Sequence, residues 1–522
     1  MYFDLPNPGL RAYFGHVREG QPDEYRTPFA KGKSPQEVCA EWATTLETIS
    51  DKWPTLLDFE NDLRAKVGPM SIMKPLEQRL TDIDSYYESI LKDSVPIDTR
   101  AIDCVLDEFE PVRGLRQRSL DGTLQKMRKS TNSGSPFFTK RKNVHMEYCQ
   151  AYFYPADKHC VIISEPNWNA SPACAILGWR GQEGGPSKDD VKQRVVWMFP
   201  YAVNVRELQI YQPLIEACQK FNLVPAWVSM EEVDRRITAM FDTKGKDDLV
   251  ICTDFSKFDQ HFNEDMADAS RSILLDLLTP DSRSKDWIIN VFPIKYNIPL
   301  AYDYGVIRYG RHGMASGSGG TNADETLAHR ALQYEAALHN NAILNPNSQC
   351  LGDDGVLTYP GITVEDVIRS YTAHGQEMNE SKQYVSTQDC VYLRRWHHTD
   401  YRINNVCVGV YSTYRALGRL CEQERFYDEG IWSAKMVALR QLSIIENVKN
   451  HPLRDQFAQF CMARDKFRLG LDIPGFLDNI EELAQKSTEL MPDFLGYTKS
   501  MQKRQDTGIN DWWIVKYLKS LK

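Results

Sequence analysis

Two short acidic segments of this 522-residue chain contain the residue types needed for metal-dependent chemistry. In DLVICTDFSKFDQHF, an apolar run leads to Asp254, and Asp259 follows five residues later; in SQCLGDDGVLTYP, Asp353 and Asp354 stand side by side, 99 and 100 positions after Asp254. Carboxylates held this close repel one another unless a cation lies between them, and ligand sets made only of oxygen suit Mg²⁺ or Mn²⁺. If the two segments meet, they predict a site for two such ions, the arrangement that supports phosphoryl transfer.

Each acidic segment is expected at the end of a β-strand. The run 249–251 suits a buried strand, and a carboxylate that follows such a strand faces the crevice where α/β sheets bind ligands. A helix after this strand would bring Asp259 round to the same space, one turn further on. The second segment predicts a hairpin with Asp353 and Asp354 at its tip. The alternatives are a helix cap at the first segment and a plain surface turn at the second.

A glycine-rich loop lies between the acidic segments. The sequence SGSGG is followed by Thr321 and Asn322, and then by a helical pattern with Ala323, Leu327 and Ala331 on one face. A glycine-rich loop that leads into a helix is a phosphate-binding arrangement, and glycine lets the backbone approach a ligand closely. The loop lacks the GK[ST] sequence of a P-loop, and a flexible linker is the alternative.

Charge is distributed unevenly along the chain. The net charge is −9, yet residues 113–142 hold nine Lys or Arg and one acid, Asp121, which gives a local charge of +8. Basic residues interleaved with aromatic residues predict a loop that grips a nucleic-acid strand, with a solvated basic face as the alternative. No apolar run is long enough for a membrane span, the first residues do not form a secretory signal, and the 12 cysteines form no CxxC pair. We therefore expect an intracellular protein with reduced, mostly buried thiols.

The remaining patterns predict a mixed α/β middle followed by a helical C-terminal region. Strand-like runs alternate with helical patterns between about residues 145 and 410, and helical patterns dominate after residue 412. Near the N-terminus, Ser34 followed by Pro35 predicts a helix start. The C-terminal segment 508–522 predicts an amphipathic helix that packs on the body, or alternatively a segment that lies across a product exit.

The ordered set DFSKFD, SGSGGTN and GDD resembles motifs A, B and C of viral RNA-dependent RNA polymerases, in wording most similar to those of picobirnaviruses and more distantly of partitiviruses. Other segments resemble further motifs of the family: TNSGSP resembles motif G at the template entrance, DVKQRVVWMFP motif F, NESKQYV motif D and CVYLRRWH motif E. The resemblance covers about residues 130–398.

The resemblance implies a role for each matching residue. Asp254, Asp353 and Asp354 would bind two Mg²⁺ or Mn²⁺ ions as catalytic residues, and Lys382 would be the general acid for pyrophosphate. The other implied sites are ribose recognition by Asp259, Ser316, Thr321 and Asn322, triphosphate binding by Lys192 and Arg194, and the template entrance at Thr131, Ser133, Gly134 and Pro136. A polar pair at the ribose favours RNA synthesis, because a protein distinguishes RNA from DNA through the 2′-hydroxyl.

The resemblance also implies a mixed α/β closed right hand, whose palm is an antiparallel sheet flanked by helices. The expected divisions are 1–95 bridging fingers and thumb, 96–247 fingers, 248–265 palm, 266–303 a fingers insertion, 304–405 palm, and 406–522 a helical thumb with a C-terminal tail. Expected partners are a single-stranded RNA template, nascent RNA, nucleoside triphosphates and a viral capsid protein, with no membrane. The protein would replicate a double-stranded RNA genome in the host cytoplasm, inside the virion, and would start without a primer. The rival hypotheses are a reverse transcriptase and a non-enzymatic viral RNA-binding protein.

Overall fold

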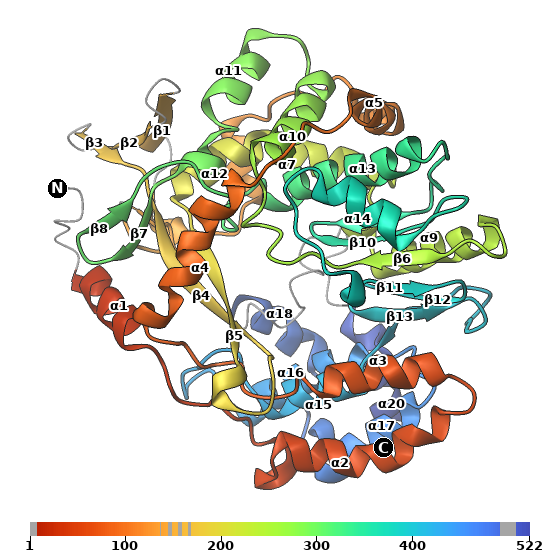
Figure 1. The fold of residues 1–522 in the computed structure, drawn as a ribbon. Coiled ribbons are helices and arrows are strands. Elements are labelled where there is room, and N and C mark those ends of the chain that lie inside the picture. The colour runs from red at the N-terminus through yellow and green to blue at the C-terminus, as the bar shows by residue number, and fades with distance from the viewer. Residues whose placement is uncertain (1–7, 136, 145–148, 155–158, 165–168, 491–507) are drawn as a thin grey trace.

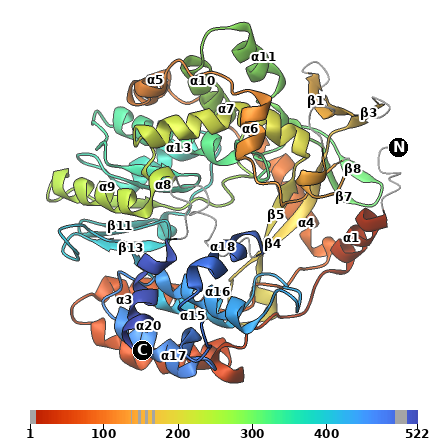
Figure 2. The same ribbon diagram turned by 180° about the vertical axis from the view of Figure 1, so that it is seen from behind.

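The computed structural model describes residues 8–135, 137–144, 149–154, 159–164, 169–490 and 508–522. The chain forms a mixed α/β structure in which all but one of the strand pairs are antiparallel (Figures 1 and 2). Nine of the ten cysteines whose thiols the structure describes are buried, as expected. Among these residues, no helix combines the length and the apolar character that crossing a bilayer requires.

The central sheet has the strand order β11-β6-β10-β9 and is antiparallel. Its strands are β6 (Val250–Thr253), β9 (Gln349–Leu351), β10 (Asp354–Leu357) and β11 (Tyr384–Ser386). Side chains alternate between the two faces, and both faces are covered. Ile251 and Leu357 join a large core with helices α10 (Glu264–Leu277) and α13 (Thr321–His339). Val250, Cys252 and Val356 pack with helix α9 (Met230–Thr243). Burial on both faces explains why the sequence here is an uninterrupted apolar run.

Helix α13 is buried on nearly all sides because it packs against α5 (Thr99–Glu108), α10, α14 (Val364–Thr372) and β9. The predicted apolar positions Ala323, Leu327 and Ala331 are buried, but so are polar residues on the other faces. Asp324 is fully buried and accepts hydrogen bonds from the hydroxyls of Tyr211 and Tyr296, both at 2.6 Å. Its oxygen also lies 3.0 Å from the buried ammonium of Lys295. The Asp324 carboxylate, with all of these partners, therefore fixes the first turn of α13.

A second sheet carries a long hairpin that joins two parts of the molecule. Strands β4 (Ala175–Gln182) and β5 (Lys192–Met198) pair along their whole length, and β7 (Leu300–Asp303) and β8 (Val306–Arg308) continue the sheet. The hairpin runs down towards the C-terminal helices (Figure 1). There the Arg180 guanidinium donates to Glu424 at 2.6 Å. A Cβ atom on Gly68 would lie 1.8 Å from the Gly185 carbonyl oxygen, and one on Gly181 would lie 1.8 Å from that of Met70. The N-terminal segment 66–70 is thus in backbone contact with the hairpin.

The N-terminal helices share a core with the C-terminal helices. Helices α2 (Pro35–Leu46) and α3 (Pro54–Arg64) contact α15 (Thr413–Cys421), and the three lie close together in both views (Figures 1 and 2). Ser34 caps α2, which confirms the predicted helix start, and it forms a complete capping box with Glu37. The C-terminal helix α20 (Trp513–Ser520) buries Ile514, Val515 and Leu518 in the same core. This confirms the packed amphipathic helix.

The other elements complete this framework. The N-terminal part also contains α1 (Pro8–Glu19), α4 (Leu76–Glu88) and α6 (Leu120–Lys126). The middle also contains β1 (Cys149–Tyr154), β2 (His159–Ser164), β3 (Asn169–Pro172), α7 (Tyr201–Lys220), α8 (Pro225–Val228), α11 (Ser282–Asn290) and α12 (Ile294–Asn297). The C-terminal part adds β12 (Asp389–Tyr392), β13 (Arg395–His398), β14 (Val410–Tyr411), α16 (Ala434–Glu446), α17 (Arg454–Arg464) and α18 (Ile480–Leu490).

Candidate active site

The strand register brings the two acidic segments together. Gly355 of β10 pairs with Thr253 of β6, so the next positions outward, Asp354 and Asp254, lie opposite each other at the open end of the strand pair. Leu351 pairs with Asp354, which leaves Gly352 and Asp353 as a two-residue turn. Gly352 has φ 59°, a conformation that hairpin turns of this length favour at glycine. Asp353 is therefore at the tip, as predicted, whereas Asp354 is the first residue of the strand rather than part of the turn.

The ionisation of these carboxyls reflects their closeness. The pKa of Asp354 is raised to about 7, mainly by burial and next by the neighbouring charge of Asp353. Burial also raises the pKa of Asp254; the charge of Lys382 opposes this shift, and that of Asp353 adds to it. The backbone N–H of Leu393, in the turn between β12 and β13, donates to the Asp354 carboxylate at 2.8 Å. The site thus concentrates negative charge that a cation would stabilise.

Asp259 reaches the same region through a turn, so the expected helix after Asp254 is wrong. Lys257 has φ 53°, which a right-handed helix cannot accommodate, and Phe255 and Phe258 are both buried with ring centroids 4.7 Å apart. Burial raises the pKa of Asp259, while a side-chain hydrogen bond with Glu325 opposes the shift. Burial beside Asp259 raises the pKa of Glu325 well above its usual range. Their close approach therefore disfavours the ionisation of both carboxyls at once.

The glycine-rich loop is pressed against its neighbours. The Ser316 hydroxyl donates to the Val195 carbonyl at 3.2 Å, and that of Thr321 donates to the Ala315 carbonyl at 3.0 Å. A Cβ atom on Gly317 would lie 1.5 Å from the Trp197 carbonyl oxygen, and one on Gly320 would lie 2.3 Å from the Tyr211 ring. This close packing rules out the flexible-linker alternative in this structure.

Two side chains of helix α7 form hydrogen bonds with the glycine-rich loop. The buried Glu207 carboxylate accepts hydrogen bonds from the Ser318 hydroxyl and, at 3.2 Å, from the Gly319 N–H. The Asn204 amide donates to the Gly317 carbonyl at 3.3 Å. Three consecutive loop residues are therefore held by two side chains of one helix.

Basic side chains surround the carboxylates. Lys192 and Arg194 occupy alternate positions on the exposed face of β5, and their charges oppose the rise in the pKa values of Asp254 and Asp259, respectively. Lys382, at the end of a short 3₁₀ helix (Glu380–Lys382), acts on Asp254 in the same way. Each of these cations is thus close enough to a carboxylate of the site to affect its ionisation.

Two more cations belong to this group and were missed in the sequence. Burial lowers the pKa of Lys66, and the charges of Lys192 and Arg394 lower it further. Burial lowers the pKa of Arg394 to about 10, with Arg415 as the next cause. Lys66 lies in a region without a recognisable motif, and the contact of the segment 66–70 with the β4–β5 hairpin brings it here.

Three further residues support the site through contacts that no sequence pattern indicates. The Gln383 amide accepts from the Asp254 N–H and donates to the Asp254 carbonyl, both at 2.8 Å. The Trp227 indole donates to the Asn322 amide oxygen at 2.8 Å. Glu325 is the third. The only available signal was adjacency, since Gln383 follows Lys382 and Glu325 follows Asn322 by three positions.

The expected template-entrance residues form a compact turn at the start of α7. Ser133 is fully buried, accepts a hydrogen bond from the Thr139 N–H at 3.1 Å and accepts another, through its carbonyl, from the Tyr201 N–H. Gly134 has φ 63° and lies against the Phe199 carbonyl, and the Thr131 carbonyl accepts from the Arg141 N–H. Pro136 lies outside the described residues. The hydroxyl of Ser133 is thus directed into the turn.

The described residues contain no group of three His, Cys, Asp or Glu side chains close enough to enclose a metal ion by themselves. The donor set is nonetheless the right kind for Mg²⁺ or Mn²⁺, which keep several waters and take other ligands from phosphate oxygens. Two facing carboxylates with raised pKa values and a third at the hairpin tip fit such a partly open site.

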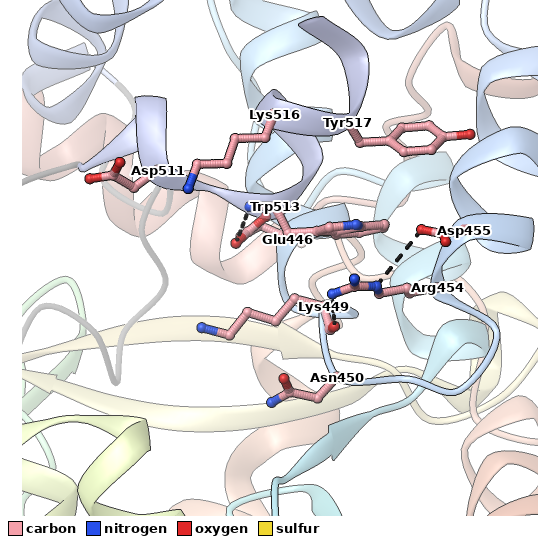
Figure 3. Close-up of a pocket in the computed structure, with 9 residues that line it drawn as sticks. All are labelled: Glu446, Lys449, Asn450, Arg454, Asp455, Asp511, Trp513, Lys516 and Tyr517. Atoms are coloured by element: carbon pink, nitrogen blue, oxygen red, sulfur yellow. Dashed lines mark hydrogen bonds and ion pairs between the residues drawn. The ribbon is translucent and has the colours of Figure 1, made fainter. Parts of the chain in front are cut away.

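A pocket of about 560 Å³ lies on the C-terminal helices, apart from every predicted site residue. Figure 3 shows Trp513 of α20 beside Arg454, whose guanidinium carbon is 5.2 Å from the ring centroid. The Glu446 carboxylate accepts the N–H groups of Trp513 and Ile514 at 3.0 and 2.9 Å. These contacts cap and anchor α20.

Known proteins are similar to this chain over most of its length. Residues 78–453 match the family model described as viral RNA-dependent RNA polymerase. A curated relative, the "Potential RNA-dependent RNA polymerase" of human picobirnavirus (strain Human/Thailand/Hy005102/-), is 62% identical over 525 residues, covering 99% of this chain and 98% of the relative.

Solved structures extend the likeness to the whole fold. The crystal structure of the RNA-dependent RNA polymerase of a human picobirnavirus has a TM-score of 0.94 and 61% identity. An insertion-loop deletion mutant of such a polymerase has a TM-score of 0.93 and 60% identity. Each match covers 100% of this chain and 98% of the other. The expected right hand of fingers, palm and thumb is confirmed, and RNA synthesis is favoured over the two rival hypotheses. The chain belongs to the family of viral RNA-dependent RNA polymerases.

Proposed function

We propose that this polymerase extends RNA by two-metal nucleotidyl transfer at Asp254, Asp353 and Asp354. The observation that carries the proposal is the register that sets Asp254 opposite Asp354, with Asp353 at the adjoining tip. Divalent ions held there would lower the pKa of an attacking hydroxyl and offset the charge of the leaving group.

The chain's own residues then account for the rest of the reaction. Lys192 and Arg194 hold the triphosphate of the incoming nucleotide, with Lys66 and Arg394 adding positive charge behind them. The 3′-hydroxyl of the growing strand gives up its proton to water, and its oxygen forms a bond to the α-phosphorus. The bond between that phosphorus and the oxygen that bridges it to the β-phosphorus breaks. Lys382 supplies a proton to the departing pyrophosphate.

Ribose selection is assigned to Asp259, Ser316 and Asn322, with Thr321 as their support. Asp259 accepts a hydrogen bond from a ribose hydroxyl and Asn322 donates one, so a nucleotide that lacks the 2′-hydroxyl leaves polar groups unpaired. RNA is the template and the product, and the template entrance is assigned to the turn that contains Thr131, Ser133 and Gly134. Initiation without a primer, a double-stranded RNA genome, contact with a capsid protein and location inside the virion in the host cytoplasm are further parts of the proposal.

The test is incorporation of labelled nucleotides on a single-stranded RNA, with Mg²⁺ or Mn²⁺, and with and without a primer. Asp353→Ala should abolish incorporation while leaving the unfolding temperature within a few degrees. An Asp353→Ala variant that retains normal incorporation would refute the assignment. Product formed only in the primed reaction would refute primer-independent initiation but leave the chemistry in place.

A further inference from the structure

The orientation of the Asn322 side chain matters for the proposed function, in which Asn322 recognises the ribose. An amide can present either its oxygen or its nitrogen to a ligand, because the two groups have nearly the same shape. Which one faces the nucleotide decides whether Asn322 can donate a hydrogen bond to the 2′-hydroxyl. The structure contains a group that settles this choice.

The Trp227 indole nitrogen lies 2.8 Å from the Asn322 amide oxygen. An indole N–H is only a donor, so its partner must be the amide oxygen and not the amide nitrogen. The amide nitrogen of Asn322 makes no hydrogen bond to the described part of the chain. It faces Gly352: a Cβ atom added to this glycine would lie 3.8 Å from the nitrogen. Gly352 is next to Asp353, so the free N–H groups point towards the catalytic hairpin.

Trp227 is itself fixed by the fold. It is fully buried in the main core, within the short helix α8 that starts at Pro225. Its backbone N–H donates to the Val224 carbonyl at 2.9 Å, and its carbonyl accepts from the Gln219 amide at 3.0 Å. The indole therefore holds its position before any nucleotide arrives.

The two sides of the ribose site then have opposite polarity. Asp259 offers an acceptor and Asn322, held by Trp227, offers donors. A hydroxyl between them can donate to one and accept from the other. If the amide turned over, its oxygen would face the same hydroxyl, and both sides would compete for a single proton.

We propose that Trp227 is a positioning residue for ribose selection: it fixes the Asn322 amide with its nitrogen towards the nucleotide, and thereby sets the preference for ribonucleotides over deoxyribonucleotides. Trp227 does not touch the substrate and acts only through Asn322.

The test is Trp227→Phe, which removes the N–H and keeps an aromatic ring. The readout is the ratio of kcat/KM for ATP to kcat/KM for dATP on one primed RNA template. We expect this ratio to fall about tenfold, the effect of one hydrogen bond, through a loss for ATP with little change for dATP. A purely structural defect would lower both values together.

Trp42→Phe is the matched control. Trp42 is also fully buried and donates its indole N–H to a side chain, the Thr413 hydroxyl, at 2.8 Å, but it lies in the core shared by the N- and C-terminal helices. The control should leave the ATP to dATP ratio unchanged at a comparable loss of thermal stability. If Trp227→Phe does not fold, replacing the Trp227 indole with benzothiophene, as in β-(3-benzothienyl)alanine, keeps the shape and removes only the N–H.

The same measurement on Asn322→Ala distinguishes the role of Trp227 from that of Asn322. A fall in the ratio for Asn322→Ala and for Trp227→Phe, but not for Trp42→Phe, supports the inference. A fall for Asn322→Ala alone overturns the role of Trp227 and leaves that of Asn322 intact. An unchanged ratio for Asn322→Ala overturns the proposed role of Asn322 and, with it, this inference.

Discussion

Replacing one carboxylate of the active site should stabilise the metal-free protein while abolishing its activity. Asp353 is a cause of the raised pKa values of Asp254, Asp259, Glu325 and Asp354. Its negative charge therefore disfavours ionisation of four other groups in the folded protein. In Asp353→Asn this repulsion is removed, and Asn is well suited to the hairpin turn.

The size of the effect follows from the charges present at pH 8. Asp259 and Asp354, with pKa values of about 6 and about 7, are then mostly ionised, so Asp353 takes part in at least two repulsive pairs. Each pair of like charges about 6 Å apart, at an effective dielectric constant of about 40–80, costs about 0.7–1.4 kcal/mol. Asp353→Asn should therefore raise the free energy of unfolding in EDTA by about 1.5–3 kcal/mol.

Urea denaturation followed by tryptophan fluorescence measures this difference, in EDTA and in Mg²⁺. Mg²⁺ at about 100 times its dissociation constant should stabilise the wild type by about 2.7 kcal/mol and Asp353→Asn by much less. The advantage of the variant should then shrink or reverse. Asp51→Asn, at an exposed turn before α3, is the charge-matched control.

Two results would refute this reasoning. If Asp353→Asn is no more stable than the wild type in EDTA, the carboxylates do not repel one another in the folded protein. If Mg²⁺ stabilises both proteins equally, Asp353 does not hold the metal.

Three further predictions concern other parts of the structure. Because the folded pKa of Asp354, about 7, exceeds its ordinary value of 3.8, its contribution to stability is lost as pH rises through that interval. The metal-free wild type should thus lose up to about 4 kcal/mol relative to Asp354→Asn between pH 4 and 8, as urea titrations can show, and parallel curves would contradict this. Lys295→Met should cost about 3–5 kcal/mol of unfolding free energy because it leaves Asp324 buried without its cation, and Lys295→Met with Asp324→Asn should recover part of the loss. Truncation before Gly508 removes α20 with three buried apolar side chains, each worth about 1.5–3 kcal/mol, and should lower the unfolding temperature; a stable truncated protein with faster initiation would instead indicate a segment that blocks product exit.

Local patterns predicted the parts of the site that follow strands and turns. Asp254 and Asp353 could be identified because each ends an apolar run, and their meeting required only that the two strands be neighbours. The turn at Asp259 could not be predicted, because the left-handed conformation of Lys257 is stabilised by the burial of Phe255 on one side and Phe258 on the other.

The supporting residues were missed for a different reason. Lys66 is brought to the site by backbone contact between segments more than 100 positions apart, and Trp227 meets Asn322 across 95 positions. Neither residue has a periodicity or a neighbour in the sequence that indicates its partner. Such contacts depend on the packing of whole elements, which a single sequence does not encode in any short window.

The backbone contact between the β4–β5 hairpin and residues 66–70 limits how far these two segments can move relative to each other. At Gly68 and Gly181 only a hydrogen atom fits between the two backbones, and the ion pair of Arg180 with Glu424 ties the same hairpin to the segment after α15. A hinge requires the backbones on its two sides to change their separation, and the close contacts at Gly68 and Gly181 leave no space for this. Any displacement of the β4–β5 hairpin should therefore carry residues 66–70 and the segment after α15 with it.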